Sequence, residues 1–385
     1  MARSTRVSSA IFSCIWRPAL WHNPQSIAPF FAAVQNAGTA KPRAWLWTGD
    51  FLLDIRRCDW HNRTLGQDML DVVAMGETMI AFEAQSYGPL REAEDFKKWV
   101  GGAADNVMVG LARLGFGCGW FSRLGKDEFG KQIFRVLRGE GIDVSRVVWD
   151  AEAPTGVFFV EKHGEGGFKC HFYRKHAAAS RMAPEDIDEE YIEQAKIVCP
   201  EGILPVVSDS SRRATEELFR IARANGQTIV FDPNLRLTLC DISTARSILI
   251  PMMQQSAYVL PGEEELLLLM DCSELAPAIE KARSLGIETL IIKRGTKGAT
   301  LVTGEKGAVD IPAFRLKSPV NSHGAGDAFV AGFIAGLLKG QALEVCARWA
   351  NAMGAFCVMG DGPYQNLPSW EDFQVFLAGE SDVIR

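Results

Sequence analysis

The clearest candidate for chemistry is a run of small residues that ends in an aspartate, Gly324-Ala-Gly-Asp327. An apolar stretch follows at 328–338 and predicts a helix. Small residues at a helix start let backbone N–H groups approach a phosphate, and the helix dipole favours an anion there. We therefore predict an anion hole formed by Gly324, Ala325 and Gly326.

Asp327 would lie in the first turn of the same helix. A carboxylate next to a bound phosphate repels that phosphate, so its presence favours a use in the reaction. We interpret Asp327 as the catalytic base, which accepts the proton of a hydroxyl that attacks a γ-phosphate. The alternative is a carboxylate that only caps the helix.

A second glycine cluster, Gly101-Gly-Ala-Ala-Asp-Asn106, precedes another predicted helix. The backbone of Gly102 and the side chain of Asn106 are candidates for contacts with a polyol ligand. An ordinary turn between a strand and a helix is the alternative interpretation.

Short apolar runs alternate with helical patterns from residue 71 onward, which favours a mainly parallel sheet with helices on both faces. The predicted strands are 71–76, 117–122, 196–199, 227–231, 257–260, 288–293 and 299–303, and the predicted helices are 103–114, 127–140, 188–195, 211–225, 262–270, 274–285, 325–339 and 342–358. Alternating aromatic and polar residues within 79–100 and 156–175 indicate a separate small sheet. This sheet is a candidate lid over a site.

The composition excludes several classes of protein. The chain has 385 residues, a net charge of −6 and 47% apolar residues, which is ordinary globular usage. The acidic balance argues against a nucleic-acid partner, and the sequence lacks the long apolar run of a membrane span. Nine cysteines occur with no Cys-x-x-Cys pair, which favours free thiols and a cytoplasmic location over disulfides or a zinc site.

Residues 1–70 differ in composition from the rest of the chain. They hold five of the ten tryptophans, and eight Lys and Arg against four Asp and Glu. We expect this N-terminal extension to be disordered or not part of the native protein, because the first clean apolar strand begins just after Met69. A targeting segment, rich in Arg and Ser, and a real accessory segment are the alternatives.

Together the two glycine clusters resemble the two signatures of the ribokinase-like (PfkB-type) carbohydrate kinases, Gly-Gly-x-x-x-Asn and Asp-Thr-x-Gly-Ala-Gly-Asp. The segment Gly125-Lys-Asp-Glu-Phe-Gly130 is similar to that family's Gly-x-Asp-x-Phe-Gly. The resemblance implies an α/β fold, a three-layer α/β/α domain over residues 71–380 with a small β-sheet lid. It also implies transfer of the γ-phosphate of ATP, with Mg²⁺, to a hydroxyl of a sugar or keto-deoxy sugar acid.

Three further segments resemble the 2-keto-3-deoxygluconate kinases and their near relatives: Tyr173-Arg-Lys-His-Ala-Ala-Ala-Ser180, Gly202-Ile-Leu-Pro205 and Phe231-Asp-Pro-Asn-Leu-Arg236. The resemblance makes Arg174 and Arg236 the candidates for binding the substrate carboxylate, which guanidinium groups hold with paired hydrogen bonds. Structural salt bridges are the alternative for both arginines. Phe172 is a substrate-binding candidate that stands where those enzymes often have a tyrosine.

The nucleotide contacts also follow from the resemblance. The predicted ATP-binding residues are Asn234, Gly295, Thr296, Lys297, Gly298 and Asn351. Glu265 is predicted to act on Mg²⁺ through water, because its segment resembles a motif linked to magnesium. Two residues depart from the family pattern, since Asn321 replaces an aspartate and His323 replaces a small residue. We expect His323 to line the nucleotide pocket, and the change at Asn321 puts monovalent-cation binding in doubt.

Three functions stay open at this point. The favoured one is a kinase for 2-keto-3-deoxygluconate, which would form the 6-phosphate. A kinase for a neutral ketose such as fructose is the first alternative, and a non-catalytic sugar sensor on the same fold is the second. We also expect a homodimer that pairs through the outer face of the lid, with Val157, Phe159 and Phe172 as candidate contacts.

Overall fold

The computed structural model describes residues 70–164, 167–304, 307–316, 320 and 322–379, and the backbone of 45–48 and 51–54. The chain divides into two units, residues 1–67 and 68–385. In the first unit, β1 (Trp45–Thr48) pairs antiparallel with β2 (Phe51–Asp54), a hairpin that the sequence did not indicate. The other predictions for residues 1–70 lie outside the described residues and stay predictions.

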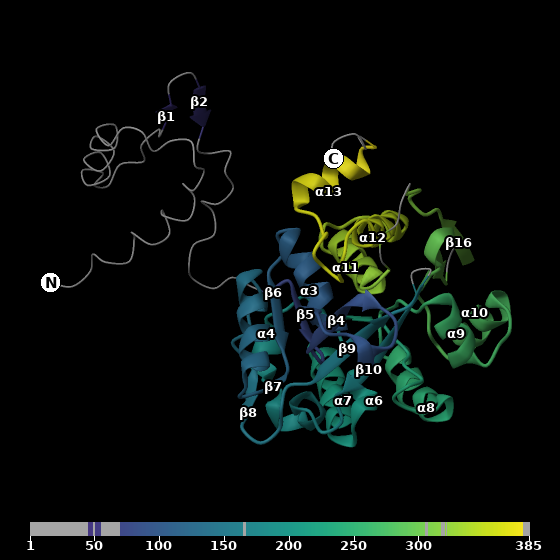
Figure 1. Ribbon diagram of the computed structural model, residues 1–385. Helices are drawn as coiled ribbons and strands as arrows, with labels where there is room; N and C mark the ends of the chain where they lie inside the picture. The colour runs from purple at the N-terminus through teal and green to yellow at the C-terminus, as the bar shows by residue number, and fades with distance from the viewer. Residues whose placement is uncertain are drawn as a thin grey trace. The chain divides into compact units, whose positions relative to one another are not determined.

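The second unit is built on an eight-stranded sheet in the order β16-β15-β14-β13-β12-β11-β3-β6. Figure 1 labels its two edge strands, β16 and β6. Its strands are β3 (Val72–Met75), β6 (Cys118–Phe121), β11 (Ile197–Val198), β12 (Thr228–Phe231), β13 (Tyr258–Val259), β14 (Leu290–Lys293), β15 (Ala299–Thr303) and β16 (Gly307–Ile311). Six strands, from β14 to β6 in the sheet order, run parallel to one another. At the other edge, β15 pairs antiparallel with β14, and β16 pairs antiparallel with β15. The mainly parallel sheet predicted from the alternation is confirmed.

Helices cover both faces of this sheet. One layer holds α3 (Ala103–Arg113), α4 (Glu128–Gly139), α11 (Ala325–Leu338), α12 (Leu343–Val358) and α13 (Trp370–Leu377), and the other holds α5 (Glu189–Glu193), α6 (Leu204–Val207), α7 (Asp209–Ala224), α8 (Ile242–Gln254), α9 (Glu263–Met270) and α10 (Leu275–Ser284). Each layer of helices packs on its own hydrophobic core, and we call the core under α3, α11 and α12 the first core and the other the second core. In strand β3, Val72 and Ala74 belong to the first core, whereas Val73 and Met75 belong to the second. Such a strand is apolar on both faces because both faces are covered.

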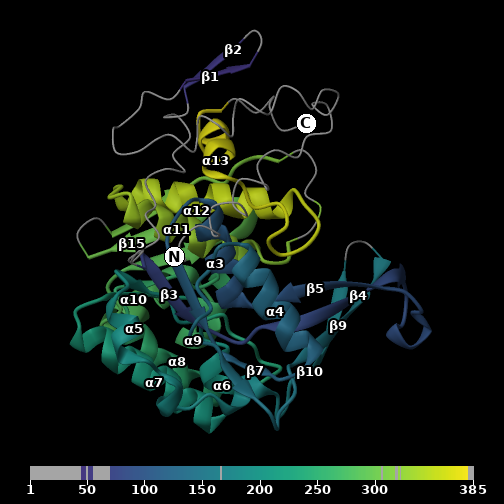
Figure 2. The ribbon, with the colours of Figure 1, turned by 90° about the vertical axis from the view of Figure 1, so that its left-hand side faces the viewer.

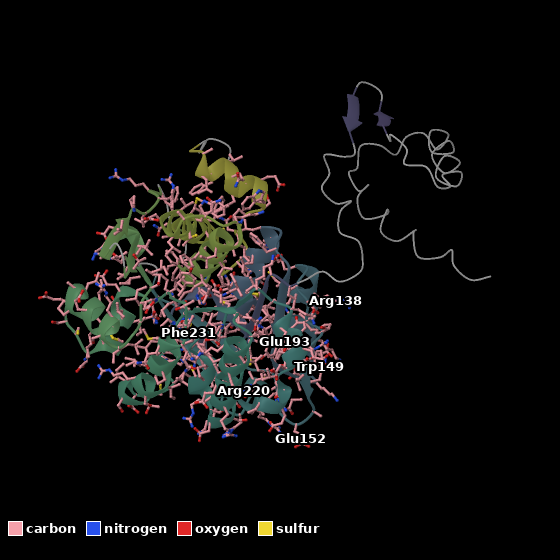
Figure 3. All side chains as sticks on the ribbon, turned by 180° about the vertical axis from the view of Figure 1, so that it is seen from behind. Arg138, Trp149, Glu152, Glu193, Arg220 and Phe231 are labelled. Atoms are coloured by element: carbon pink, nitrogen blue, oxygen red, sulfur yellow. The ribbon has the colours of Figure 1, made fainter. Side chains whose placement is uncertain are left out.

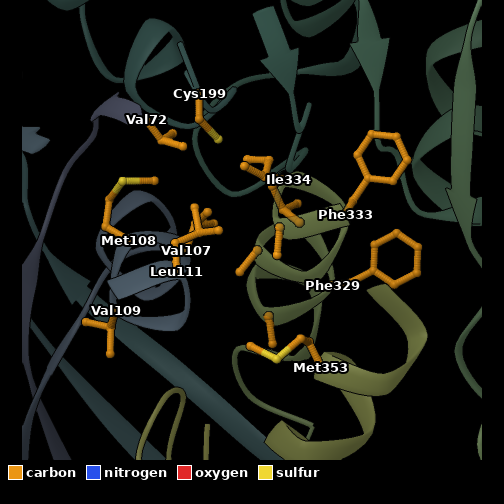
Figure 4. Close-up of a cluster of buried hydrophobic side chains, with 14 of the residues drawn as sticks. Val72, Val107, Met108, Val109, Leu111, Cys199, Phe329, Phe333, Ile334 and Met353 are labelled. Atoms are coloured by element: carbon orange, nitrogen blue, oxygen red, sulfur yellow. The ribbon is translucent and has the colours of Figure 1, made fainter. Parts of the chain in front are cut away.

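The first core joins the two helices that carry the glycine clusters. Figure 4 shows Val107 and Leu111 of α3 on one side and Ile334 of α11 on the other, with Met353 of α12 below them. Because α3 and α11 pack together, their N-terminal ends are held close to each other. The sequence places these two ends more than 200 residues apart, and the core brings them to one place.

A second, four-stranded sheet has the order β10-β9-β4-β5, and we call it the side sheet. Its strands are β4 (Met79–Tyr87), β5 (Phe96–Gly101), β9 (Val157–Lys162) and β10 (Phe168–Tyr173), and Figure 2 shows them extending to one side of the helical layers. Phe158 and Phe172 face each other as partners on one face, whereas Phe159 lies on the opposite face against Phe82. Phe172 therefore does not share a face with Phe159, and our assignment of both to one outer surface was wrong, because side chains alternate along a strand.

Short elements complete the unit. Strand β7 (Arg123–Gly125) pairs parallel with β8 (Val148–Asp150), and short 3₁₀ turns of the described residues lie at 90–92, 178–181, 184–186 and 295–297. Figure 3 shows the molecule from behind and labels Arg138 of α4 and Arg220 of α7, both of which are exposed. Within the described part of the chain, none of the helices combines the length and the apolar character of a bilayer span.

Candidate active site

A cavity of about 430 Å³ lies between the side sheet and the main sheet. Four of its lining residues follow parallel strands at their carboxyl ends: Glu77 after β3, Asp232 after β12, Gly262 after β13 and Lys293 at the end of β14. The carboxyl edge of an open parallel sheet is where ligands of α/β proteins bind. The remaining lining residues come from the side sheet, from the segments that follow β10, β11 and β12, and from the starts of α3, α9 and α11.

Asp327 is half-buried at this cavity, in the first turn of α11. The Asn106 amide Nδ2 donates a hydrogen bond of 2.7 Å to Asp327 Oδ2, which joins the two glycine clusters directly. Burial raises the pKa of Asp327 to about 7, with a smaller raising effect from Asp232, while the bond from Asn106 acts in the opposite direction. A carboxyl group with this pKa suits proton transfer near neutral pH.

The loop before Asp327 needs its glycine. Gly324 is the N-cap of α11 and has a φ of +78°, a conformation that favours glycine. A Cβ at this position would lie 2.4 Å from the carbonyl oxygen of Pro363. Gly324, Gly326 and Asp327 line the cavity, and Ala325 lies between them in sequence but is absent from the lining.

Gly102 is the N-cap of α3 and lines the same cavity. A Cβ there would lie 2.3 Å from the carbonyl oxygen of Glu77 and 2.3 Å from the carboxylate Oδ1 of Asp105. Only glycine lets the start of α3 lie this close to the end of β3. The close approach is what places Asn106 beside Asp327.

The two arginines differ in their surroundings. Arg174 is only 8% exposed, and it forms a hydrogen-bonded ion pair with the buried carboxylate of Glu77. Arg236 is exposed at the cavity, and the described residues include no carboxylate that pairs with it. Both line the cavity, so they converge as the resemblance implied, but Glu77 already balances the charge of Arg174.

A second ion pair lies in the cavity wall and was not found by sequence reasoning. Lys293 Nζ lies 2.6 Å from Asp232 Oδ2. Burial alone would lower the pKa of Lys293, but the carboxylates of Asp232 and Glu265 raise it above its ordinary value. The ammonium group is therefore charged, and the ideal position of a Cβ on Gly326 lies 3.6 Å from it. The signal available in the sequence was the position of Lys293 at the end of a strand, directly before Arg294-Gly295.

The predicted nucleotide residues fall into two groups. Asn234 lines the cavity with a φ of +40°, whereas Gly295, Thr296, Lys297 and Gly298 form a turn outside its lining. Asn351 is buried, and its amide nitrogen donates to the carbonyl oxygens of Ile311 and Pro312 at 3.1 Å each. Asn234 therefore lies in the cavity with the substrate candidates, whereas the other five predicted nucleotide residues lie outside the cavity lining.

Glu265 lines the cavity at the start of α9, where its Oε2 accepts a hydrogen bond of 2.6 Å from the backbone N–H of Gly262. The described residues hold no group of three His, Cys, Asp or Glu side chains able to enclose a metal ion. A magnesium ion that keeps water and phosphate ligands needs only one or two protein carboxylates. The oxygens of Glu265 and Asp232 fit that indirect kind of site.

Several further carboxyl groups are buried behind the cavity. Burial raises the pKa of Glu201 to about 8, although the backbone N–H groups of Ile203 and Leu204 donate to it. Burial also raises the pKa of Asp105 well above its ordinary value, and the hydroxyl of Thr78 donates to it at 2.7 Å. The site therefore lies in a region where carboxyl groups hold protons more strongly than in water.

His323 lines the cavity, and its ring lies against the side sheet. Its ring centroid is 5.1 Å from that of Trp99 and 5.5 Å from that of Phe168. Burial lowers the pKa of His323, and the nearby Arg236 lowers it further, so its imidazole is neutral at pH 7. Asn321, the other departure, lies outside the described residues.

Comparisons with known proteins identify this constellation. The family model described as pfkB family carbohydrate kinase matches residues 69–370. Two 2-dehydro-3-deoxygluconokinases are each 34% identical: that of Bacillus subtilis over 82% of this chain and 97% of that protein, and that of Thermoproteus tenax over 80% and 94%. A crystal structure of a putative ribokinase II of E. coli, in complex with ATP and Mg²⁺, is 27% identical with a TM-score of 0.75, over 80% of this chain and 99% of that one.

The fold and the site thus define a ribokinase-like phosphotransferase for an alcohol acceptor. The chain belongs to the pfkB family of carbohydrate kinases and is a sugar kinase.

Proposed function

We propose that the enzyme transfers the γ-phosphate of ATP to 2-dehydro-3-deoxygluconate, also called 2-keto-3-deoxygluconate, and forms the 6-phosphate. The observation that carries this proposal is a single cavity in which Asp327, bonded to Asn106, lies with an unpaired guanidinium, that of Arg236. The two relatives at 34% identity are named for this same acceptor.

Asp327 is the base of the proposed mechanism. Asn106 orients its carboxylate, which accepts the proton of the primary hydroxyl of the acceptor. The freed oxygen forms a bond to the γ-phosphorus as the bond from that phosphorus to the bridging β,γ-oxygen breaks, and ADP leaves. Backbone N–H groups at 324–327 and the ammonium of Lys293 stabilise the negative charge on the transferred group.

At the other end of the acceptor, Arg236 pairs with the carboxylate. Arg174 contributes hydrogen-bond donors rather than net charge, because Glu77 balances it. The deoxygenated carbon of the acceptor faces the apolar wall formed by Phe172 and Phe158, which offers no hydroxyl group.

The nucleotide is proposed to extend from the cavity toward the turn at Gly295, Thr296, Lys297 and Gly298, with Asn234 near its phosphates. Asn351 supports this side indirectly, by fixing the backbone at Ile311 and Pro312. Glu265 and Asp232 are the residues that would hold Mg²⁺ through water, and the ion neutralises phosphate charge when bound.

A panel of acceptors tests the proposal. ATP turnover is measured with 2-keto-3-deoxygluconate, gluconate and fructose, and the product is identified by mass spectrometry. We expect kcat/KM for the keto-deoxy acid to exceed that for fructose more than tenfold. A higher value for fructose supports a neutral-ketose kinase, and no turnover with any acceptor supports a sugar sensor.

We also propose a cytoplasmic location and a homodimer. A cytoplasmic protein fits the thiols of Cys199, Cys346 and Cys357, which form no disulfide among the described residues. A homodimer through the outer face of the side sheet fits the aromatic group of Phe82, Phe96, Phe159 and the exposed Tyr173.

A further inference from the structure

His323 connects the phosphoryl loop with both edges of the side sheet. It directly precedes Gly324, and its ring contacts Trp99 edge to face, at an interplanar angle of 81°. It also contacts Phe168 at an angle of 35°. Trp99 belongs to β5 and Phe168 to β10, which are the two outermost strands of the side sheet. One side chain therefore touches the sheet at both of its edges.

The ring contacts continue from His323 into the substrate side of the cavity. The ring of Trp99 lies 5.6 Å from that of Phe158, and Phe158 is stacked on Phe172 at 5.2 Å. The guanidinium carbon of Arg174 lies 5.6 Å from the centre of the Phe172 ring. All of these residues line the cavity, so a continuous row of side chains joins the phosphoryl loop to a proposed substrate arginine.

We propose that His323 is a positioning residue that fastens the side sheet, acting as a lid, to the phosphoryl loop. The contact holds the aromatic wall over the acceptor and excludes water from the transferred phosphoryl group. The inference rests on the proposed function for its acceptor, and it adds a role to a residue that does not touch the reacting atoms.

The expected size of the effect follows from aromatic packing. An aromatic pair contributes about 2- to 12-fold to an equilibrium constant beyond the area that it buries. His323 makes two such pairs, so the loss of its ring lowers the equilibrium constant for the closed arrangement about 4- to 140-fold. Acceptor binding weakens by the same factor if the wall must be in place for the acceptor to bind.

The test compares His323→Val, which removes the ring, with His323→Phe, which keeps one. In the full-length protein, we expect His323→Val to raise the Kd for 2-keto-3-deoxygluconate about tenfold by calorimetry without nucleotide. ATP hydrolysis without acceptor should rise, while KM for ATP stays within about twofold. His323→Phe should restore both values to within about threefold of the wild type.

Two more variants distinguish a specific contact between His323 and the side sheet from a general loss of structure. Phe168→Ala removes one partner of His323, and its effect on Kd should not add to that of His323→Val, because both break the same contact. Tyr173→Ala removes an aromatic ring from the opposite face of β10 and should leave Kd unchanged. The inference is overturned if His323→Val changes neither the Kd for the acceptor nor the rate of ATP hydrolysis. It is also overturned if His323→Phe fails to restore these two values, or if the effects of His323→Val and Phe168→Ala on Kd are additive.

The inference and the proposed function fail in different ways. A wild-type enzyme that does not bind or phosphorylate the keto-deoxy acid refutes the proposed function. ATP hydrolysis without acceptor then tests the role of His323 by itself. Faster hydrolysis in His323→Val than in the wild type supports that role, and equal rates refute it.

Discussion

Replacing Arg236 with Ala should separate acid from neutral acceptors. Its guanidinium is exposed at the cavity, and the described residues supply no carboxylate partner, so a substrate carboxylate is its natural counter-charge. A hydrogen bond to a charged group contributes about 1.5–3 kcal/mol. The KM for 2-keto-3-deoxygluconate should therefore rise about 10- to 150-fold, whereas KM for fructose should change less than about threefold.

Arg174→Ala is the matched contrast, because Arg174 is buried against Glu77. Its removal leaves the Glu77 carboxylate buried without its cation, a loss of about 3–5 kcal/mol of stability. We expect Tm to fall by about 5–10 °C and activity to decrease on both acceptors. Steady-state kinetics on the two acceptors and a thermal melt distinguish the variants. If Arg236→Ala harms fructose as much as the acid, the assignment of Arg236 to the carboxylate is refuted.

Three other results are expected. Because a base must be ionised and the pKa of Asp327 is about 7, kcat should rise about tenfold per pH unit below pH 7 and level off above it. Asp327→Asn should lose at least about 10²-fold in turnover, while calorimetry should still detect ATP binding. Near-normal turnover in that variant contradicts the role of Asp327 as the base. A chain that begins at Met69 should fold and keep its activity, since the family match begins at residue 69, and an insoluble or inactive product would show that the preceding segment is needed. Sedimentation at micromolar concentration should detect dimers, and Phe159→Glu on the outer face of the side sheet should return the protein to monomers, whereas monomers in the wild type would count against pairing through that face.

Most of the fold could be predicted because its elements carry strong periodic patterns. Every predicted strand and helix of the second unit is present, with ends that differ by at most two residues. Helix α8 was missed because Pro251 interrupts it and its apolar residues form no clear stripe. Strand β16 was missed because a five-residue edge strand that contains a glycine and an aspartate gives a weak signal.

The candidate site was predictable where a motif keeps its functional residues close together. Asp327, Gly324 and Gly102 stand in such motifs, and the cavity holds all three. The pairs Glu77–Arg174 and Lys293–Asp232 were not foreseen, because each joins segments 97 or 61 residues apart and spacing says nothing about such contacts. Asp232 stood inside the quoted Asp-Pro-Asn-Leu-Arg segment, but only the fold shows its partner.

The carboxyl groups in and behind the cavity link folding to proton uptake. The folded-state pKa values of about 8 for Glu201 and about 7 for Asp327 lie above the ordinary values of 4.5 and 3.8. At neutral pH the native state therefore binds protons that the unfolded chain has already released. The contribution of these two groups to the free energy of unfolding therefore decreases as pH rises from about 4 to 8, because the native state keeps their protons longer. Ionisation of Asp327 makes the enzyme active over the upper part of that same interval, so the proton that this group must lose for catalysis is one whose retention stabilises the fold.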